Sequence, residues 1–268
     1  MNMTLNNAPA PLHFALPVPD ISAWRAGNTG VEGVWHFDSG KPGRNVMVSA
    51  LVHGNELCGA WALKGLLEAG VRPEQGSLTL AFCNLAAFDR FDAAHHDASR
   101  FVDQDLNRQW LDERMDAGDS SERRRAAALR PFVQRADRFG LPDDQAGDTR
   151  SLLIECGFHG DPASLQVAQD QCVRFIEQSG VISAAALAQQ LPGWRLPDAP
   201  RQWALEVTQP VVARSAAFRF VEPFTGLECI EKQGTVIGDN DGEPVLTPYD
   251  DCVLVMPSTR QAQSGVTV

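Results

Sequence analysis

The sequence predicts a layered α/β domain followed by a small all-β domain. Up to about residue 200, apolar runs of strand length alternate with amphipathic helical segments, and polar residues follow the strands. After that point the pattern changes to short alternating runs broken by Gly, Pro and Asp. We therefore expect a mixed, largely parallel sheet flanked by helices over residues 1–200, and a small β domain over residues 201–268.

The first strand is expected over residues 45–52, an almost continuous apolar run of the kind that is buried on both faces of a sheet. It ends at the polar turn His53–Glu56. A helix follows, because apolar residues recur near the helical period from Leu57 to Leu67, and Gly70 suits its C-terminal cap. Active sites of α/β units form at the carboxyl ends of strands, so this turn is a candidate site.

Later elements complete the predicted domain. A second strand is expected over Ser77–Cys83, and a helix over Ser120–Arg138 with Ser120 or Ser121 as its cap. A polar loop over residues 140–148 leads to a third strand, Ser151–Cys156, and to an amphipathic helix. The runs expected to form the β domain are Ala204–Thr208, Ala217–Val221, Thr235–Gly238 and Cys252–Met256.

Composition excludes some classes of partner. The formal net charge of -11 over 268 residues would repel a phosphate backbone, so nucleic acid is not expected. No stretch approaches the roughly 20 apolar residues of a membrane span, and the N-terminus lacks the pattern of a signal peptide. The six cysteines form no C-x-x-C pair and lie mostly in apolar runs, as free thiols do. We expect a cytoplasmic protein without a membrane partner; homo-oligomerisation stays open.

Three polar groups could carry chemistry, and each also has a purely structural explanation. His53 and Glu56 offer nitrogen and oxygen to a metal such as zinc, or they simply form a surface turn before a helix. The segment 100–108 offers two arginines and an amide to a carboxylate or carbonyl oxygen, or forms a surface ion-pair patch. Glu155 follows an apolar run, where it would act as a general base or pair with an arginine.

Taken in this order, the motifs resemble the succinylglutamate desuccinylase/aspartoacylase family, which is related to the zinc carboxypeptidases. They are His-Gly-Asn-Glu after a strand, Arg-x-x-Asp-x-Asp-Leu-Asn-Arg in a polar stretch, and Ile-Glu-Cys-Gly after another strand. The match extends from about Val46 to Ser164, and the β tail resembles the family's small C-terminal domain. The resemblance implies a zinc carboxypeptidase-like fold and a hydrolase that cleaves an amide or ester of a small, anionic N-acyl amino acid-like substrate.

The resemblance also implies a role for each matching residue. His53 and Glu56 would bind Zn²⁺, and Glu155 would activate the metal-bound water and transfer its proton. Arg100 would polarise the scissile carbonyl. The carboxylate of the substrate would be held by Asn107 and Arg108.

The sequence departs from the family at the third zinc ligand. Family members carry a histidine between the Asn-Arg and Glu-x-Gly motifs, whereas this chain has no histidine between Arg108 and Ile154. That interval is also too short and polar to supply the strand on which the histidine lies. The residues considered as substitutes are His159, His95, His96 and an acid such as Asp105. In a further interpretation the chain is a shortened homologue without hydrolytic activity.

A second hypothesis comes from a different functional class. A non-catalytic family member would bind a small anionic ligand through Arg100, Asn107 and Arg108, or would bind a protein partner. Stoichiometric zinc with three protein donors would favour the hydrolase. Ligand binding without metal or turnover would favour the binding protein.

Overall fold

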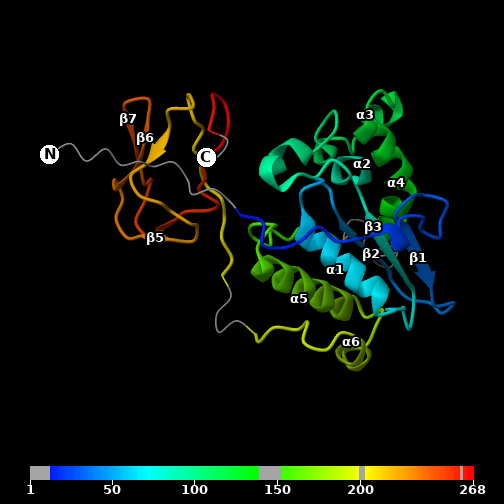
Figure 1. Ribbon diagram of the computed structural model, residues 1–268. Helices are drawn as coiled ribbons and strands as arrows, with labels where there is room; N and C mark the ends of the chain where they lie inside the picture. Colours follow the sequence, from blue (N-terminus) through cyan, green and yellow to red (C-terminus); the bar gives the residue numbers. More distant parts are fainter. Residues whose placement is uncertain (1–12, 139–151, 199–202, 260–261) are drawn as a thin grey trace. The chain divides into compact units, whose positions relative to one another are not determined.

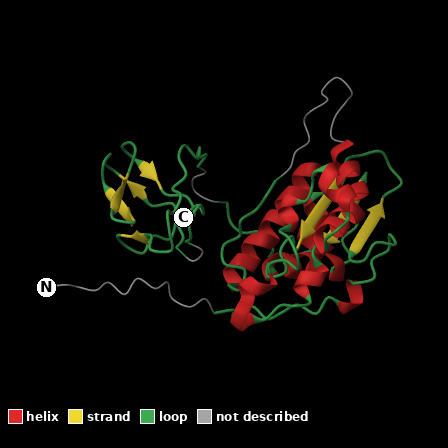
Figure 2. Cartoon of the chain, turned by 90° about the horizontal axis from the view of Figure 1, so that it is seen from above, coloured by secondary structure: helices red, strands yellow, loops and turns green. Residues whose placement is uncertain are grey.

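The computed structural model describes residues 13–138, 152–198, 203–259 and 262–268. Two compact units form, with the division after residue 198. The first contains the helices and one sheet, and the second contains short strands only among its described elements (Figure 2). The polar loop expected over residues 140–148 lies outside the described residues.

The sheet of the first unit has three strands in the described part of the chain. They are β1 (Val34–Asp38), β2 (Asn45–Ala50) and β3 (Ser77–Phe82), in the order β1-β3-β2. β2 runs parallel to β3, whereas β1 runs antiparallel to it. The sheet is therefore mixed, as expected. In the described sheet one pairing is parallel and the other antiparallel, so the largely parallel arrangement that we expected is not seen there. The antiparallel strand β1 was not predicted.

The central strand β3 is buried along its whole length, with side chains alternating between two apolar cores. Leu78, Leu80 and Phe82 belong to the core shared with α1 (Leu57–Glu68) and α5 (Pro162–Ser179). Ala81 belongs to the core shared with α4 (Ser121–Arg138). The first unit thus has three layers, with α1 and α5 on one face of the sheet and α4 on the other (Figure 1).

The helix ends follow the capping residues in the sequence. Ser120 caps α4, because its Oγ accepts a hydrogen bond of 3.2 Å from the backbone N–H of Arg123. Gly70 follows α1 with a φ of 66°. The remaining helical elements are η1 (Ser22–Trp24), α2 (Leu85–Phe88), η2 (Ala93–Ser99), η3 (Leu106–Arg108), α3 (Asp112–Ala117) and α6 (Ala184–Gln190). Among the described helices, none is long and apolar enough to cross a membrane.

The second unit is built from short antiparallel strands, as expected for a small β domain. Its strands are β4 (Arg219–Phe220), β5 (Cys229–Ile230), β6 (Val236–Asn240), β7 (Glu243–Leu246) and β8 (Cys252–Val253). β4, β6 and β7 form one sheet, and β5 pairs with β8. The run Ala204–Thr208 was wrongly predicted as a strand, since its described residues 204–208 are irregular and exposed.

The strand predicted over Ser151–Cys156 is also wrong for its described residues. Residues 152–156 are irregular, and the side chains of Leu152 and Leu153 are 57% and 75% exposed. An apolar run forms a strand only where a neighbouring strand satisfies its backbone N–H and C=O groups. In the described sheet β2 is an edge strand, and residues 152–156 do not pair with it.

Candidate active site

The candidate site begins where β2 ends. Leu51 is fully buried with a φ of 58°, a conformation that costs a residue with a Cβ on the order of 1 kcal/mol. Its carbonyl accepts a 2.6 Å hydrogen bond from the N–H of Asn84, and that of Ala50 accepts one of 2.8 Å from Cys83. These bonds from the end of β3 hold the chain in the bend that leads to His53.

Gly54 allows the turn to pack against two other segments. A Cβ at this position would clash with the backbone of Ala87, Phe88 and Ser99. The N–H of Gly54 also donates a 3.1 Å hydrogen bond to the carbonyl of Arg100. Only glycine fits this approach, which brings the His53 turn beside the segment that carries Arg100.

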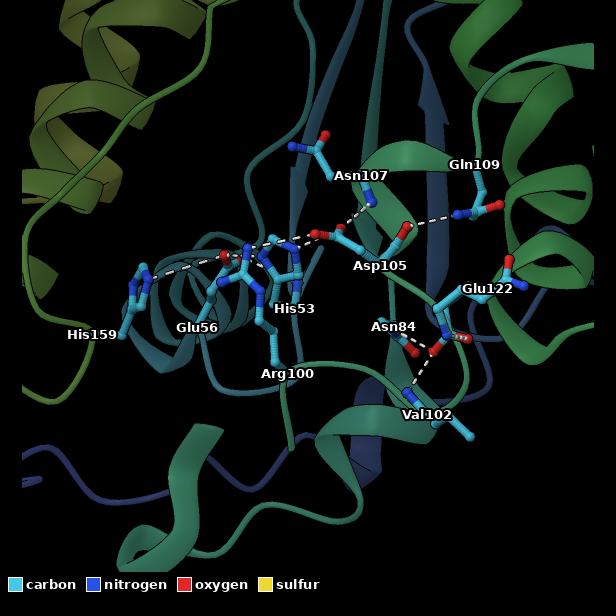
Figure 3. A network of polar contacts seen from close by, with 11 residues as sticks. His53, Glu56, Asn84, Arg100, Val102, Asp105, Asn107, Gln109, Glu122 and His159 are labelled. Carbon is cyan, nitrogen blue, oxygen red and sulfur yellow. Dashed lines mark hydrogen bonds and ion pairs between the residues drawn. The ribbon is translucent and has the colours of Figure 1, made fainter. Parts of the chain in front are cut away.

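His53 lies at the centre of the polar contacts (Figure 3). It is 5% exposed, and its Nδ1 lies 2.6 Å from Oε1 of Glu56. Its Nε2 lies 2.9 Å from Oδ1 of Asp105. The second oxygen of Glu56 accepts a 3.0 Å hydrogen bond from the backbone N–H of His53. The imidazole of His53 is thus held between the carboxylate of Glu56, three residues away, and that of Asp105, 52 residues away.

The charges of these three groups depend on one another. Burial lowers the pKa of His53, but its hydrogen bonds with Glu56 and Asp105 outweigh burial and the pKa is raised. Burial raises the pKa of Glu56 and that of Asp105, but in each case the contact with His53 outweighs it and the pKa is lowered. As it stands, the arrangement favours a cationic imidazole between two anionic carboxylates.

The second predicted group lies beside the first. Nη2 of Arg100 lies 3.6 Å from Oδ2 of Asp105, and the Arg100 side chain is 38% exposed. Oδ1 of Asp105 caps η3 by accepting a 2.8 Å hydrogen bond from the N–H of Asn107. The side chains of Asn107 and Arg108 are exposed at this turn. Asp105 therefore links the histidine to the segment predicted to bind substrate.

Glu122 was missed by the sequence analysis, although it holds this segment in place (Figure 3). It is fully buried on α4 and accepts hydrogen bonds from the N–H groups of Val102, Asp103 and Gln104 at 2.7, 3.1 and 3.1 Å. Nδ2 of Asn84 donates a fourth at 3.1 Å. Burial raises the pKa of Glu122, but these donors outweigh it and the pKa is lowered. In sequence, Glu122 resembles any acid in the first turn of a helix.

The third predicted residue, Glu155, is not in the apolar setting that we expected. Its side chain is exposed within the irregular residues 152–156. Residues 152–156 form no strand, so the described sheet does not enclose this side chain. The role of Glu155 as general base stays a prediction.

His159, four residues further on, is turned toward the site (Figure 3). Its Nε2 lies 4.0 Å from Oε1 of Glu56, and its Nδ1 lies 3.2 Å from Sγ of Cys58. Burial lowers the pKa of His159. The other histidines considered have different neighbours: His95 is bonded to Asp92 with 77% of its side chain exposed, and His96 packs beside two phenylalanine rings.

The donors fit a metal only in part. Within the described ranges, no three His, Cys, Asp or Glu side chains are arranged, as they stand, to hold a metal ion. His53 and Glu56 do supply nitrogen and oxygen of the kinds that zinc accepts, directed at each other over 2.6 Å. Asp105 occupies the far nitrogen of His53, the place where metal-binding histidines normally have a second partner.

Comparisons with known proteins agree with the motifs. Residues 42–143 match the succinylglutamate desuccinylase/aspartoacylase catalytic domain. The structure resembles a succinylglutamate desuccinylase/aspartoacylase from Rhodobacter sphaeroides, with a TM-score of 0.52 and 17% identity over 85% of each chain. It also matches a succinylglutamate desuccinylase from Vibrio cholerae, with a TM-score of 0.46 and 13% identity over 88% of this chain and 84% of the other. No curated protein matches the sequence.

Proposed function

From the succinylglutamate desuccinylase/aspartoacylase catalytic domain that residues 42–143 match, we propose that this chain is a zinc-dependent deacylase. It would cleave an amide or ester bond in a small, carboxylate-bearing N-acyl amino acid-like substrate. The observation that carries the proposal is the buried contact of 2.6 Å between His53 and Glu56 at the end of β2, with Asp105 behind the histidine.

His53 and Glu56 would hold the metal, and Asp105 would fix the orientation of His53 through Nε2. When bound, zinc would supply a Lewis acid and a water of lowered pKa. The bend at Leu51 and the close approach of Gly54 set the position of both side chains before any ligand arrives.

Arg100, Asn107 and Arg108 would bind the anionic substrate. Arg100 lies 3.6 Å from Asp105, and its charge also acts on His53. At this position its guanidinium would stabilise a carbonyl oxygen that gains negative charge. Asn107 and Arg108 present exposed polar side chains from the adjacent turn. The chain carries a net charge of -11, so local arginines are needed to attract an anion.

Glu155 would act as the base that takes the proton of the attacking water and delivers it to the leaving group. His159, four residues further along the chain, lies 4.0 Å from Glu56. This short separation in sequence supports a place for Glu155 near the proposed metal ligands. A cytoplasmic location is part of the proposal, because all six cysteines are free.

The alternative is a non-catalytic protein that binds a small carboxylate or a protein partner. The exposure of Glu155 favours it, since a general base works best in an enclosed site. Both functions use Arg100 and Arg108, so ligand binding by itself does not separate them.

The test is hydrolysis of a panel of N-acyl amino acids by zinc-loaded protein, with the released amine measured by chromatography. We expect turnover that falls by about 100-fold or more in Glu155→Gln, the typical effect of losing a general base. Arg195→Gln is the matched control, because Arg195 pairs with Glu177 away from the site. Saturable binding of N-acyl amino acids without turnover by the zinc-loaded protein would establish the alternative.

A further inference from the structure

Two cysteines that are distant in sequence meet beside the candidate site. Cys58 lies on the first turn of α1, and Cys156 ends the irregular segment 152–156. Their thiols are hydrogen-bonded to each other, and both side chains pack in the core shared by α1 and α5. Both thiols are free, and neither has a part in the proposed function. We infer that Cys58 and Cys156 are a redox-sensitive pair that forms a reversible disulfide between α1 and the segment that carries Glu155.

The two thiols differ in their access to solvent. Cys58 is 2% exposed, whereas Cys156 is partly exposed on a segment that forms no strand. An oxidant from solution therefore reaches Cys156 first, and Cys58 is placed to react with it afterwards. The hydrogen bond from Cys58 also lowers the pKa of Cys156 and outweighs burial, which raises it. Cys156 thus has the properties of the attacking cysteine, and Cys58 those of its resolving partner.

The oxidant is a low-molecular-weight disulfide such as glutathione disulfide. The thiolate of Cys156 attacks one of its sulfurs, so a mixed disulfide forms and one glutathione leaves. The sulfur of Cys58 then attacks the Cys156 sulfur of the mixed disulfide and displaces the second glutathione. Nδ1 of His159 lies 3.2 Å from Sγ of Cys58, so it is placed to take the Cys58 proton in this step. The protein pair loses two electrons, and both thiol protons end on the two glutathione molecules.

The other four cysteines are less suited to such a link. Cys83 is 1% exposed and packs in the core on the α4 face of the sheet. Cys229 and Cys252 lie at neighbouring rather than facing positions of the paired strands β5 and β8, so their side chains point to opposite faces. Cys172 on α5 is the competitor, because it lies close enough to Cys156 for their charges to interact. Burial raises the pKa of Cys172 to about 12, however, so it stays a thiol.

The disulfide would restrain a segment that the described sheet leaves unpaired. Cys156 directly follows Glu155, and Cys58 lies two residues after Glu56. A bond between the two cysteines therefore limits the positions open to Glu155 and keeps it beside the turn that carries Glu56. The inference goes beyond the proposed function and depends on neither a metal nor turnover, so it can fail or hold separately.

Thiol mapping of the folded, full-length protein tests the inference. The reduced protein is incubated with glutathione disulfide, the remaining thiols are alkylated, and the peptides are identified by mass spectrometry. We expect a link between Cys58 and Cys156 that dithiothreitol removes. No Lys or Arg separates Cys156 from Cys172, so trypsin leaves both on one peptide. Cys172→Ser is therefore mapped in parallel, and it should form the link as the wild type does.

Two single variants test the order of the steps. In Cys58→Ser the mixed disulfide has no resolving partner, so glutathione should remain attached to Cys156. In Cys156→Ser the buried Cys58 should stay unmodified. Equal attachment of glutathione to Cys58 and Cys156 in these variants would overturn the inference, because burial would then not separate the two thiols. Circular dichroism checks that each variant is folded.

Hydrogen exchange measures the effect on the segment. We expect the backbone amides of residues 152–156 to exchange about 10-fold more slowly after oxidation, because the link restricts local opening. Equal rates before and after oxidation would show that the disulfide does not restrain Glu155.

Three results of the mapping would overturn the inference without any variant at Cys58 or Cys156. The first is the absence of a link while the exposed Cys229 acquires glutathione, which shows that the reagent has acted. The second is a link between Cys156 and Cys172. The third is a link between Cys58 and Cys156 that forms only in urea, where the folded contact is lost.

Discussion

The turn after β2 and the segment around Glu155 have similar sequences but different structures. Each consists of an apolar run, then a polar residue suited to catalysis and a glycine close by. The first run pairs with β3 in parallel register from Asn45 to Ala50, and His53 beyond it is buried. The second is irregular in its described residues 152–156, and its leucines are exposed.

The difference shows that hydrophobicity alone does not make a strand. A strand also needs a neighbour for its backbone hydrogen bonds, which residues 45–50 have in β3 and residues 152–156 lack in the described sheet. The polar residues of the two segments also differ in their contacts. His53, Glu56 and Asp105 form a connected set, whereas Glu155 is an exposed side chain on an irregular segment.

The glycines of the two segments provide the largest expected contrast. Gly54→Ala would push its new methyl group into the backbone of Ala87 and Ser99, so we expect a loss of about 3 kcal/mol in the free energy of unfolding. Gly157→Ala meets only Oγ of Ser164, and its φ of 100° costs about 1 kcal/mol. Urea denaturation of both variants measures the contrast, and equal losses would contradict it.

A substitution of Glu122 tests whether the residues around the His53 turn depend on α4 for their position. In Glu122→Gln, one of the two oxygens that accept backbone N–H groups becomes a donor, so we expect a loss of about 2 kcal/mol at neutral pH.

The pH dependence follows from the lowered pKa of Glu122. Its stabilising contribution is present above its ordinary pKa of 4.5 and is lost as the pH falls through the lower folded value. The stability difference between wild type and variant should therefore shrink below about pH 4. A difference that stays constant down to pH 2 would show that the carboxylate charge is unimportant.

The smallest change in the free energy of unfolding is expected for a substitution in the segment around Glu155. Leu153 is 75% exposed, so Leu153→Ala should change the free energy of unfolding by less than about 0.5 kcal/mol. Val46 of β2 is 7% exposed, and Val46→Ala should cost about 2 kcal/mol. If Leu153→Ala is the more costly of the two, the segment is packed in solution and the contrast between the regions is wrong.

Much of the first region was predictable because its signals are local. An apolar run, a polar turn and a helical period predicted β2, His53–Glu56 and α1, and Ser120 predicted the start of α4. β1 was not predicted, because its residues Val34–Asp38 mix apolar, polar and charged side chains. The contribution of Glu122 could not be predicted from the sequence either, since it binds backbone groups about 20 residues away.

The sequence by itself determined the family resemblance and the order of the motifs, because both depend only on which residues follow one another. The tertiary structure decided which of these residues meet. It joined His53 to Asp105 across 52 positions and brought His159 to within 4.0 Å of Glu56. It also left the segment of Glu155 outside the sheet. Such contacts depend on hydrogen-bond partners and packing between distant segments, which no local pattern encodes.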